Sequence, residues 1–275
     1  MGAWTLDDIS WHCFDATKLD PELVRIVKAA SLVECNGGAY AHHLCLIFAD
    51  DAEFQATARR WGAEETQHGA ALARWAALAD PNFDFPAAFS RFQAGFHIDF
   101  DTDRSRRGSR TGEMVARCIV EVGTSSYYTA LREAATEPVL QEICRHIAAD
   151  ELRHYRLFYK QLDRCLARER VGRFGRLGVA LGRILESEDD ELAYAYYAAN
   201  QNTDALDEGY DRRRCSRAYA RRAYALYRPH HVERGIAMAL KAVGLTPNGR
   251  LSLLAGRLAW RAMRYRAARL AKTAA

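Results

Sequence analysis

The sequence has little of what marks unusual protein classes. Only 6 of its 275 residues are proline and 18 are glycine, which excludes collagen-like and low-complexity chains. Hydrophobic residues make up 49% and charged residues 27%, a balance that argues against a largely disordered chain. The composition therefore indicates a globular protein, with enough residues for one large or two modest domains.

Membrane and secretion signals are also missing. No run reaches the roughly 18 apolar residues that a membrane span requires. The first twenty residues carry four aspartates where a signal peptide would be basic and then apolar: Asp7, Asp8, Asp15 and Asp20. We therefore expect a cytoplasmic protein.

The seven cysteines contain no CxxC pair, and their number is odd. This pattern indicates neither a disulfide framework nor a zinc ribbon, so reduced thiols are expected. Only five of the 39 basic residues are lysine, and the net charge is +4. Such a small excess does not indicate a nucleic-acid partner, and none is expected.

Helical periodicity and capping signals predict four helices in the first 167 residues. Asp20-Pro21-Glu22 begins a helix that we expect to run to about Asp50, where Asp50 and Asp51 end it and cap a second helix to about Leu78. Residues 80–110 form the long connection, with a short helix expected at 87–92. The third helix is predicted over residues 111–135 and the fourth over residues 138–167. The capping signal Thr136-Glu137-Pro138 marks the start of the fourth helix.

Two helical hairpins joined by one long crossover have the topology of a ferritin-like bundle. We therefore predict an all-α fold, with a four-helix domain over residues 1–167. Residues 168–275 are also helical in pattern, and breaks are expected near 188–190, 228–229 and 246–249. We expect this second segment to be a C-terminal helical extension packed on the bundle.

Two ExxH motifs lie on the second and fourth predicted helices. Glu65 precedes His68 by three residues, and Glu151 precedes His154 by three residues. Residues at this spacing share a helix face, so each pair can direct a carboxylate and an imidazole at one metal ion. Alone, each motif is a weak signal.

The spacing of two further glutamates strengthens that signal. Glu34 and Glu65 are centred on the turn at Asp50, so an antiparallel hairpin brings both to one height, each about 23 Å from the bend. Glu121 and Glu151 are centred on Thr136 in the same way. Both lone glutamates stand in apolar runs, where an unpaired carboxylate would cost several kcal/mol.

Four carboxylates and two imidazoles thus converge, which is the ligand set of a di-iron or di-manganese centre. The alternative is that these residues are solvated acids on amphipathic helices. The predicted metal ligands are Glu34, Glu65, His68, Glu121, Glu151 and His154.

Several neighbours of these residues are candidates for supporting roles. Glu64 and Asp150 each precede a ligand, so each can reach the imidazole of the opposite hairpin, although a surface position is equally consistent with the sequence. Thr124 lies on the face of Glu121, where its hydroxyl can donate to a metal-bound oxygen species. Glycines beside the proposed metals indicate either a cavity for substrate or close helix packing; they are Gly37, Gly38 and Gly123.

The two motifs also carry a family resemblance. The segments RRWGAEETQHGAALARW and IAADELRHYRLFYKQL resemble the two iron-binding helices of the soluble acyl-carrier-protein desaturases, within the ferritin-like di-iron carboxylate superfamily. The resemblance implies that the six predicted ligands bind two iron ions and that Thr124 matches the family's threonine at the oxygen-binding face. It ends at about Ala167.

Together, the ligand set and the resemblance favour an oxidoreductase that activates dioxygen and desaturates or hydroxylates an apolar, carrier-bound or acyl substrate. The alternative is a ferroxidase or a rubrerythrin-like protein that handles iron or peroxide, and a metal-free scaffold is a third. The choice between iron and manganese stays open. Without a CxxC pair for internal electron supply, an external donor such as a ferredoxin is expected.

The C-terminal segment from Thr246 contains six arginines, Lys272 and no acidic residue, interleaved with leucines and aromatic residues. Such a helix can dock an acidic carrier protein, an acidic electron donor or an anionic membrane surface, or it can simply cover the bundle. Peripheral membrane contact and a homodimer are both left open by the sequence.

Overall fold

The computed structural model describes residues 4–96, 103–186, 190–201 and 209–272, and within these ranges all regular structure is helical. This confirms the predicted all-α class. The α-helices are α1 (Pro21–Cys35), α2 (Gly37–Ile47), α3 (Ala52–Ala79), α4 (Phe85–Gly95), α5 (Arg110–Ala134), α6 (Pro138–Leu166), α7 (Arg173–Glu186), α8 (Asp190–Asn200), α9 (Arg212–Leu226), α10 (Pro229–Ala242) and α11 (Arg250–Lys272). Three short 3₁₀ helices precede α1, at Leu6–Asp8, Trp11–Cys13 and Ala16–Lys18.

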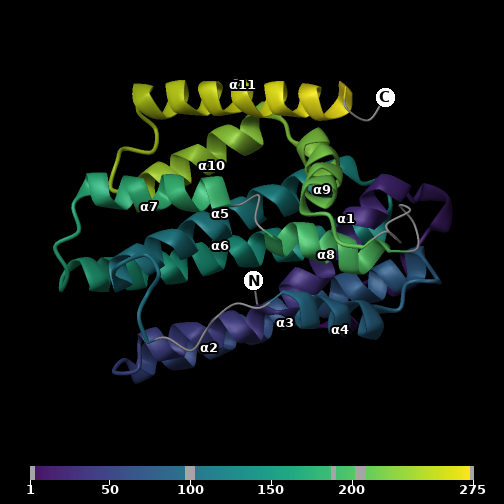
Figure 1. Cartoon of the computed structure of the whole chain (residues 1–275), viewed down its shortest axis with the longest axis horizontal. Helices are drawn as coiled ribbons and strands as arrows, with labels where there is room; N and C mark the ends of the chain where they lie inside the picture. Colours follow the sequence, from purple (N-terminus) through teal and green to yellow (C-terminus); the bar gives the residue numbers. More distant parts are fainter. Residues whose placement is uncertain (1–3, 97–102, 187–189, 202–208, 273–275) are drawn as a thin grey trace.

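Two helical hairpins form the bundle (Figure 1). In the first, α1 and α2 pack along α3; in the second, α5 packs along α6, and α3 contacts α6. The capping residues predicted from the sequence lie at the starts of these helices. The Asp20 side chain accepts a hydrogen bond from the backbone N–H of Glu22, and the Asp51 side chain accepts one from the backbone N–H of Phe54. The Glu137 side chain accepts one from the backbone N–H of Leu140. The long connection carries α4, which is longer than the short helix predicted there.

The prediction of one continuous helix from residue 21 to about residue 50 is wrong, because two helices occupy this segment. The chain breaks at Asn36, which separates α1 from α2. Asn36, Gly37 and Gly38 are three consecutive residues of low helix propensity, so the helix is weakest there. The break lies directly after Glu34 and therefore beside the predicted metal ligands.

The remaining helices cover the bundle on one side. α8 packs against α1, α7 and α10 pack against α5, and α11 packs on α10 and α9. Figure 1 shows α11 along one edge of the molecule, with α2, α3 and α4 at the opposite edge. As a result, α11 is the outermost layer.

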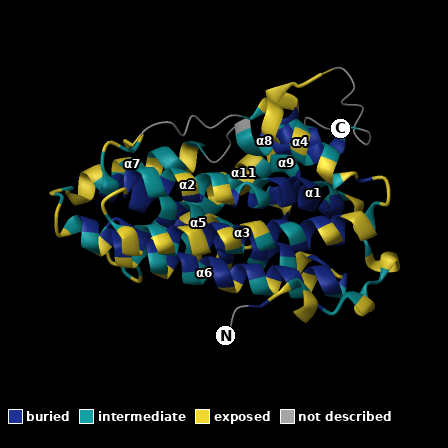
Figure 2. Cartoon of the chain, turned by 90° about the horizontal axis from the view of Figure 1, so that it is seen from below, coloured by how far each residue is buried: buried dark blue, intermediate teal, exposed yellow. Residues whose placement is uncertain are grey.

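The apolar core has two parts. Along α3, Phe54 and Trp61 belong to one cluster, whereas Leu72 and Trp75 belong to the other. The same division occurs in α6. Its buried apolar residues up to Ala148 belong to the cluster of Leu72 and Trp75, and those from Tyr155 onward belong to the cluster of Phe54 and Trp61. The two ExxH motifs lie between the clusters, and all four of their residues are buried. Figure 2 shows that buried and exposed residues alternate along α3 and α6. A polar cluster thus interrupts the core of the bundle.

Candidate metal centre

The six predicted ligands lie together in the centre of the bundle. Their exposed fractions are at most 8%, and His68 is fully buried. They come from four helices: Glu34 from α1, Glu65 and His68 from α3, Glu121 from α5, and Glu151 and His154 from α6. The imidazole ring centroids of His68 and His154 are 5.8 Å apart, and the two ring planes are inclined by 29°.

Two overlapping sets of possible ligand atoms form within this cluster. One set is Glu34, Glu65, His68 and Glu151, and the other is Glu65, Glu121, Glu151 and His154. In each set the ligand atoms lie within 4.8 Å of one another. Glu65 and Glu151 belong to both sets, so the arrangement has the form of two adjacent sites with two shared carboxylates.

The distances within each set fit a single ion. His68 Nδ1 lies 3.8 Å from Glu34, 3.5 Å from Glu65 and 3.5 Å from Glu151. His154 Nδ1 lies 3.0 Å from Glu65 and 3.5 Å from Glu121. Ligand atoms about 2.1 Å from one ion are separated by roughly 3 to 4 Å, so these spacings match the edges of a coordination shell.

The buried polar atoms of this cluster also lack hydrogen-bond partners. The unpartnered atoms include Glu65 Oε1, His68 Nδ1, Glu121 Oε2, Glu151 Oε1 and His154 Nδ1. A buried polar atom without a partner is costly, and five of them around one point need a common explanation. Two bound metal ions satisfy all five, so the residues present fit a dinuclear centre.

The outer nitrogen of each imidazole contacts an acid from the opposite hairpin. His68 Nε2 lies 3.2 Å from Asp150, and His154 Nε2 lies 2.7 Å from Glu64. An acceptor at Nε2 holds the proton there and leaves Nδ1, which faces the cluster, as the lone pair for a metal. The structure thus places Asp150 and Glu64 where the sequence analysis expects them.

Both outer acids are held in the charged form. Burial alone would raise the pKa of Asp150, but hydrogen bonds from His68, Trp4 and Arg153 outweigh it and lower the pKa to about 2. Burial likewise opposes ionisation of Glu64, and the contacts with His154 and Arg153 lower its pKa below the usual 4.5. Arg153 lies 2.6 Å from Asp150 and 2.8 Å from Glu64, so one guanidinium joins the two acids.

The inner carboxylates differ from one another. Burial opposes ionisation of Glu65, but the contacts with His154 and His68 outweigh it and lower its pKa well below 4.5. Burial and the charge of Glu65 raise the pKa of Glu34 from 4.5 to about 8, and burial with the charge of Glu151 raises the pKa of Glu121 well above its usual value. Burial also opposes protonation of His68, but the surrounding acids outweigh it and raise the pKa of this imidazole well above 6.5. The metal-free cluster therefore retains protons at neutral pH, and cations that bind there replace them.

Thr124 lies beside the cluster on α5. Its hydroxyl donates to Glu151 Oε2 at 2.6 Å and also lies 3.2 Å from the backbone carbonyl of Glu121. In this arrangement the hydroxyl orients a shared carboxylate. A role toward oxygen stays a prediction.

Two residues of this site were missed from the sequence. Trp4 donates from Nε1 to Asp150 at 2.8 Å, and its ring stacks on that of His68 with centroids 6.0 Å apart. Tyr128, which is buried, donates to Glu34 at 2.5 Å. Tyr128 stands seven residues after Glu121 and thus on the same face of α5, a spacing that the sequence analysis did not use.

The cavity predicted at the three glycines needs correction. A Cβ on Gly37 would lie 2.3 Å from the Glu65 Cβ, so this glycine permits close packing of α2 on α3 and leaves no room for substrate. Gly38 and Gly123 are exposed, and a Cβ on either meets no atom within 4 Å. Gly38 borders a surface hollow of about 320 Å³ between α2 and α3, lined in part by His42 and Arg59. None of the three therefore lines an interior cavity.

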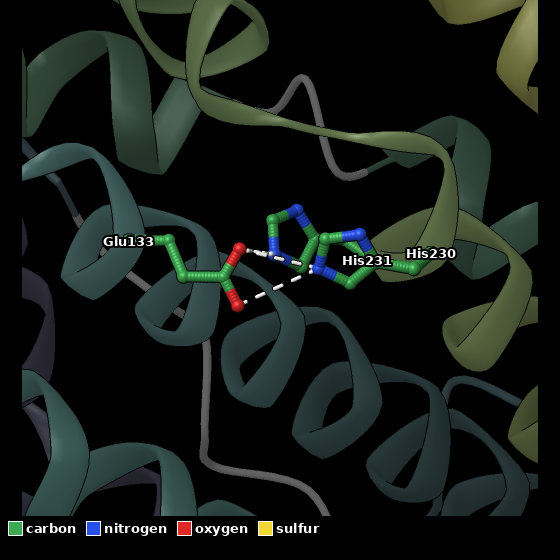
Figure 3. Close-up of side chains that lie close together, drawn as sticks. All are labelled: Glu133, His230 and His231. Atoms are coloured by element: carbon green, nitrogen blue, oxygen red, sulfur yellow. Dashed lines mark hydrogen bonds and ion pairs between the residues drawn. The ribbon is translucent and has the colours of Figure 1, made fainter.

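A third group with metal-ligand side chains lies on the surface. Glu133 on α5 faces His230 and His231 on α10 (Figure 3), and His231 Nε2 lies 3.0 Å from its carboxylate. The other ring nitrogen of His231 accepts from the backbone N–H of Arg228 at 3.0 Å. Nε2 therefore carries the proton and donates to Glu133, which makes this group a tie between α5 and α10 and a poor metal site.

One comparison with known proteins bears on this site. A model of the fatty acid desaturase family matches residues 47–173, somewhat less than half of the chain. This part of the chain is desaturase-like. The matched segment contains both ExxH motifs, Glu121 and Thr124, but it begins after Glu34 and ends at the start of α7. No curated protein matches the chain.

If Glu65 and Glu151 are shared by two ions, single replacements should differ in effect. We expect two metal ions per chain in the parent, about one in Glu121→Ala, and fewer than one in Glu151→Ala, measured by elemental analysis after purification. Glu113→Ala is the matched control, because Glu113 is also buried on α5 but lies outside the cluster. Full metal content in both ligand variants would refute the ligand assignment.

The two neighbouring glycines provide a second test. Gly37→Ala should displace Glu65 and weaken metal binding by about fivefold or more, the effect of 1 to 3 kcal/mol of overpacking. Gly38→Ala should bind metal like the parent, since its new methyl group meets nothing. Titration of both metal-free variants with Fe²⁺ or Mn²⁺ measures the difference, and equal affinities would contradict the close-packing interpretation.

Proposed function

We propose that this protein is a dioxygen-activating di-iron oxidoreductase of the desaturase or hydroxylase type, which acts on a fatty acyl or other apolar substrate. The observation that carries the proposal is the buried cluster of four glutamates and two histidines, with unpartnered atoms directed at two adjacent points. The desaturase-family match over residues 47–173 supports the reaction type and the acyl substrate class. The all-α bundle of two helical hairpins supports the proposal, and its ferritin-like character is part of what we propose.

Charge balance supports two divalent ions in this cluster. Its four carboxylates carry four negative charges when all are ionised, and two ions of charge +2 neutralise them. Both imidazoles then bind as neutral ligands through Nδ1. Iron bound here supplies the redox chemistry with dioxygen that the removal of hydrogen from an unactivated C–H bond requires. Manganese at one or both positions is a variant of the same proposal.

The residues of the chain hold and shield that chemistry. Asp150 and Glu64 fix the imidazole tautomers, Thr124 and Tyr128 orient Glu151 and Glu34, and the two apolar clusters exclude water on both sides along the bundle. When cations bind, the protons held by Glu34 and Glu121 leave the site. The carboxylates are then free to bind through one or two oxygens.

Electrons must come from outside the chain in this proposal. All seven cysteines are free thiols, and the sequence contains no CxxC pair that would hold a second iron centre. An external donor such as a ferredoxin is therefore part of the proposed reaction.

Oxygen uptake distinguishes this proposal from iron handling. With Fe²⁺ loaded and an electron donor supplied, fatty acyl substrates should stimulate oxygen consumption by the parent, and product analysis should show a new double bond or hydroxyl group. Glu151→Ala should lose both signals. If no acyl substrate stimulates uptake, while Fe²⁺ is oxidised rapidly and many ions are retained per chain, a ferroxidase or rubrerythrin-like function replaces the proposal.

A further inference from the structure

The outermost helix, α11, is amphipathic in an unusual way. Its inner face carries the buried residues Ser252 and Gly256, and a Cβ on Gly256 would meet the Glu233 side chain of α10 at 3.1 Å. These small residues let α11 lie close against α10. The opposite face of α11 is its outer face.

That outer face carries a stripe of exposed apolar side chains. Leu251, Leu254, Leu258 and Tyr265 are 59%, 56%, 53% and 66% exposed. Their spacing of three, four and seven residues places them on one side of the helix, and the stripe extends over about 21 Å at 1.5 Å per residue. These exposed fractions show that no described element covers the stripe, and Figure 1 shows α11 along the edge of the molecule.

Basic residues flank this outer stripe. Arg257, Arg261, Arg264, Arg266 and Lys272 are all exposed on the same helix. Over residues 209–272 there are 16 arginines and lysines and only two acidic residues, Asp211 and Glu233, although the whole chain has a net charge of only +4. The positive charge of the protein is therefore concentrated on α9, α10 and α11.

A separate basic hollow lies between α9 and α11. Its volume is about 480 Å³, and its lining combines the arginines of α9 and α11 with Leu185, Tyr224 and Leu270. Basic groups above apolar side chains are the combination that accommodates an anionic head group over a hydrocarbon chain.

The pattern discriminates among possible partners. A second copy of the chain would bring like charges together, and a nucleic acid would leave the leucines of the outer stripe without a function. An acidic protein would match the charge, but it requires no line of four large apolar side chains parallel to the surface. The helices of the described chain include none long and apolar enough to cross a membrane.

We infer that α11 is an interfacial helix, which binds this protein to the surface of an anionic phospholipid membrane. The outer stripe inserts at the boundary between head groups and acyl chains, and the flanking arginines contact the phosphates. This inference does not rest on the metal centre, because α11 contributes none of its residues. It would place the protein where fatty acyl chains are abundant.

Vesicle sedimentation with the full-length, metal-loaded protein tests the inference. The parent should sediment with vesicles that contain 30% phosphatidylglycerol in phosphatidylcholine and stay in the supernatant with phosphatidylcholine alone. Leu254→Ser/Leu258→Ser and Arg257→Glu/Arg264→Glu should each reduce the partition coefficient at least about tenfold. Helical content by circular dichroism and metal content should stay at the parent's values.

Two variants elsewhere serve as matched controls. Arg60→Glu/Lys160→Glu makes the same change in net charge on exposed positions of α3 and α6, and Leu78→Ser removes an exposed leucine of α3. Both should bind vesicles like the parent. If the control variants lost as much vesicle binding as the α11 variants, binding would not depend on the position of the charges and leucines, and the inference would be overturned.

The remaining outcomes also decide the question. If the parent does not bind anionic vesicles, the inference fails. If only the arginine variant loses binding, the leucines do not insert and the interfacial geometry is wrong. If light scattering shows a dimer that Leu254→Ser/Leu258→Ser dissociates, and vesicles do not bind, the stripe is a contact between copies of the chain.

Discussion

Four buried carboxylates within a few ångströms of one another are the constraint on which the rest of this structure depends. Each ionised carboxylate raises the energy of its neighbours, and burial removes the water that would screen them. Within the cluster, only the two imidazoles can carry positive charge, and two positive charges do not balance four carboxylates. Two bound cations, as proposed for this site, would offset the charge that the imidazoles leave.

The outer side chains keep this cluster in one arrangement. Asp150 and Glu64 hold the histidines, Arg153 joins these two acids, and Trp4 closes the site on the side of Asp150. Tyr128 holds Glu34 from the other hairpin. Four of the six predicted ligands thus contact a side chain outside the ligand set: His68, His154, Glu34 and, through Thr124, Glu151.

The site was largely predictable from the sequence, for a geometric reason. In an antiparallel hairpin, two residues equidistant from the turn come to one height, and capping residues such as Asp51 and Glu137 mark the turns independently. Placement of Glu34 beside Glu65 and of Glu121 beside Glu151 followed from these two facts. Their role as metal ligands stays a prediction.

Three other features of the structure were not predicted from the spacing of residues in the sequence. The break at Asn36 was hidden because apolar residues continue at helical spacing on both sides of it. In the sequence, Gly37 is equally consistent with a cavity and with close helix packing. Only the position of the Glu65 side chain distinguishes these two roles. Trp4 meets Asp150 across 146 residues of chain, from a segment with 3₁₀ turns and no amphipathic period.

We propose that two metal ions occupy the space between the two ExxH motifs. An anomalous-difference map from crystals of the metal-loaded protein, measured on both sides of the iron absorption edge, tests it most directly. Two peaks per chain are expected, about 3.5 to 4 Å apart, with Glu65 and Glu151 between them. A map without peaks at this position, in crystals shown by fluorescence to contain iron, would contradict it.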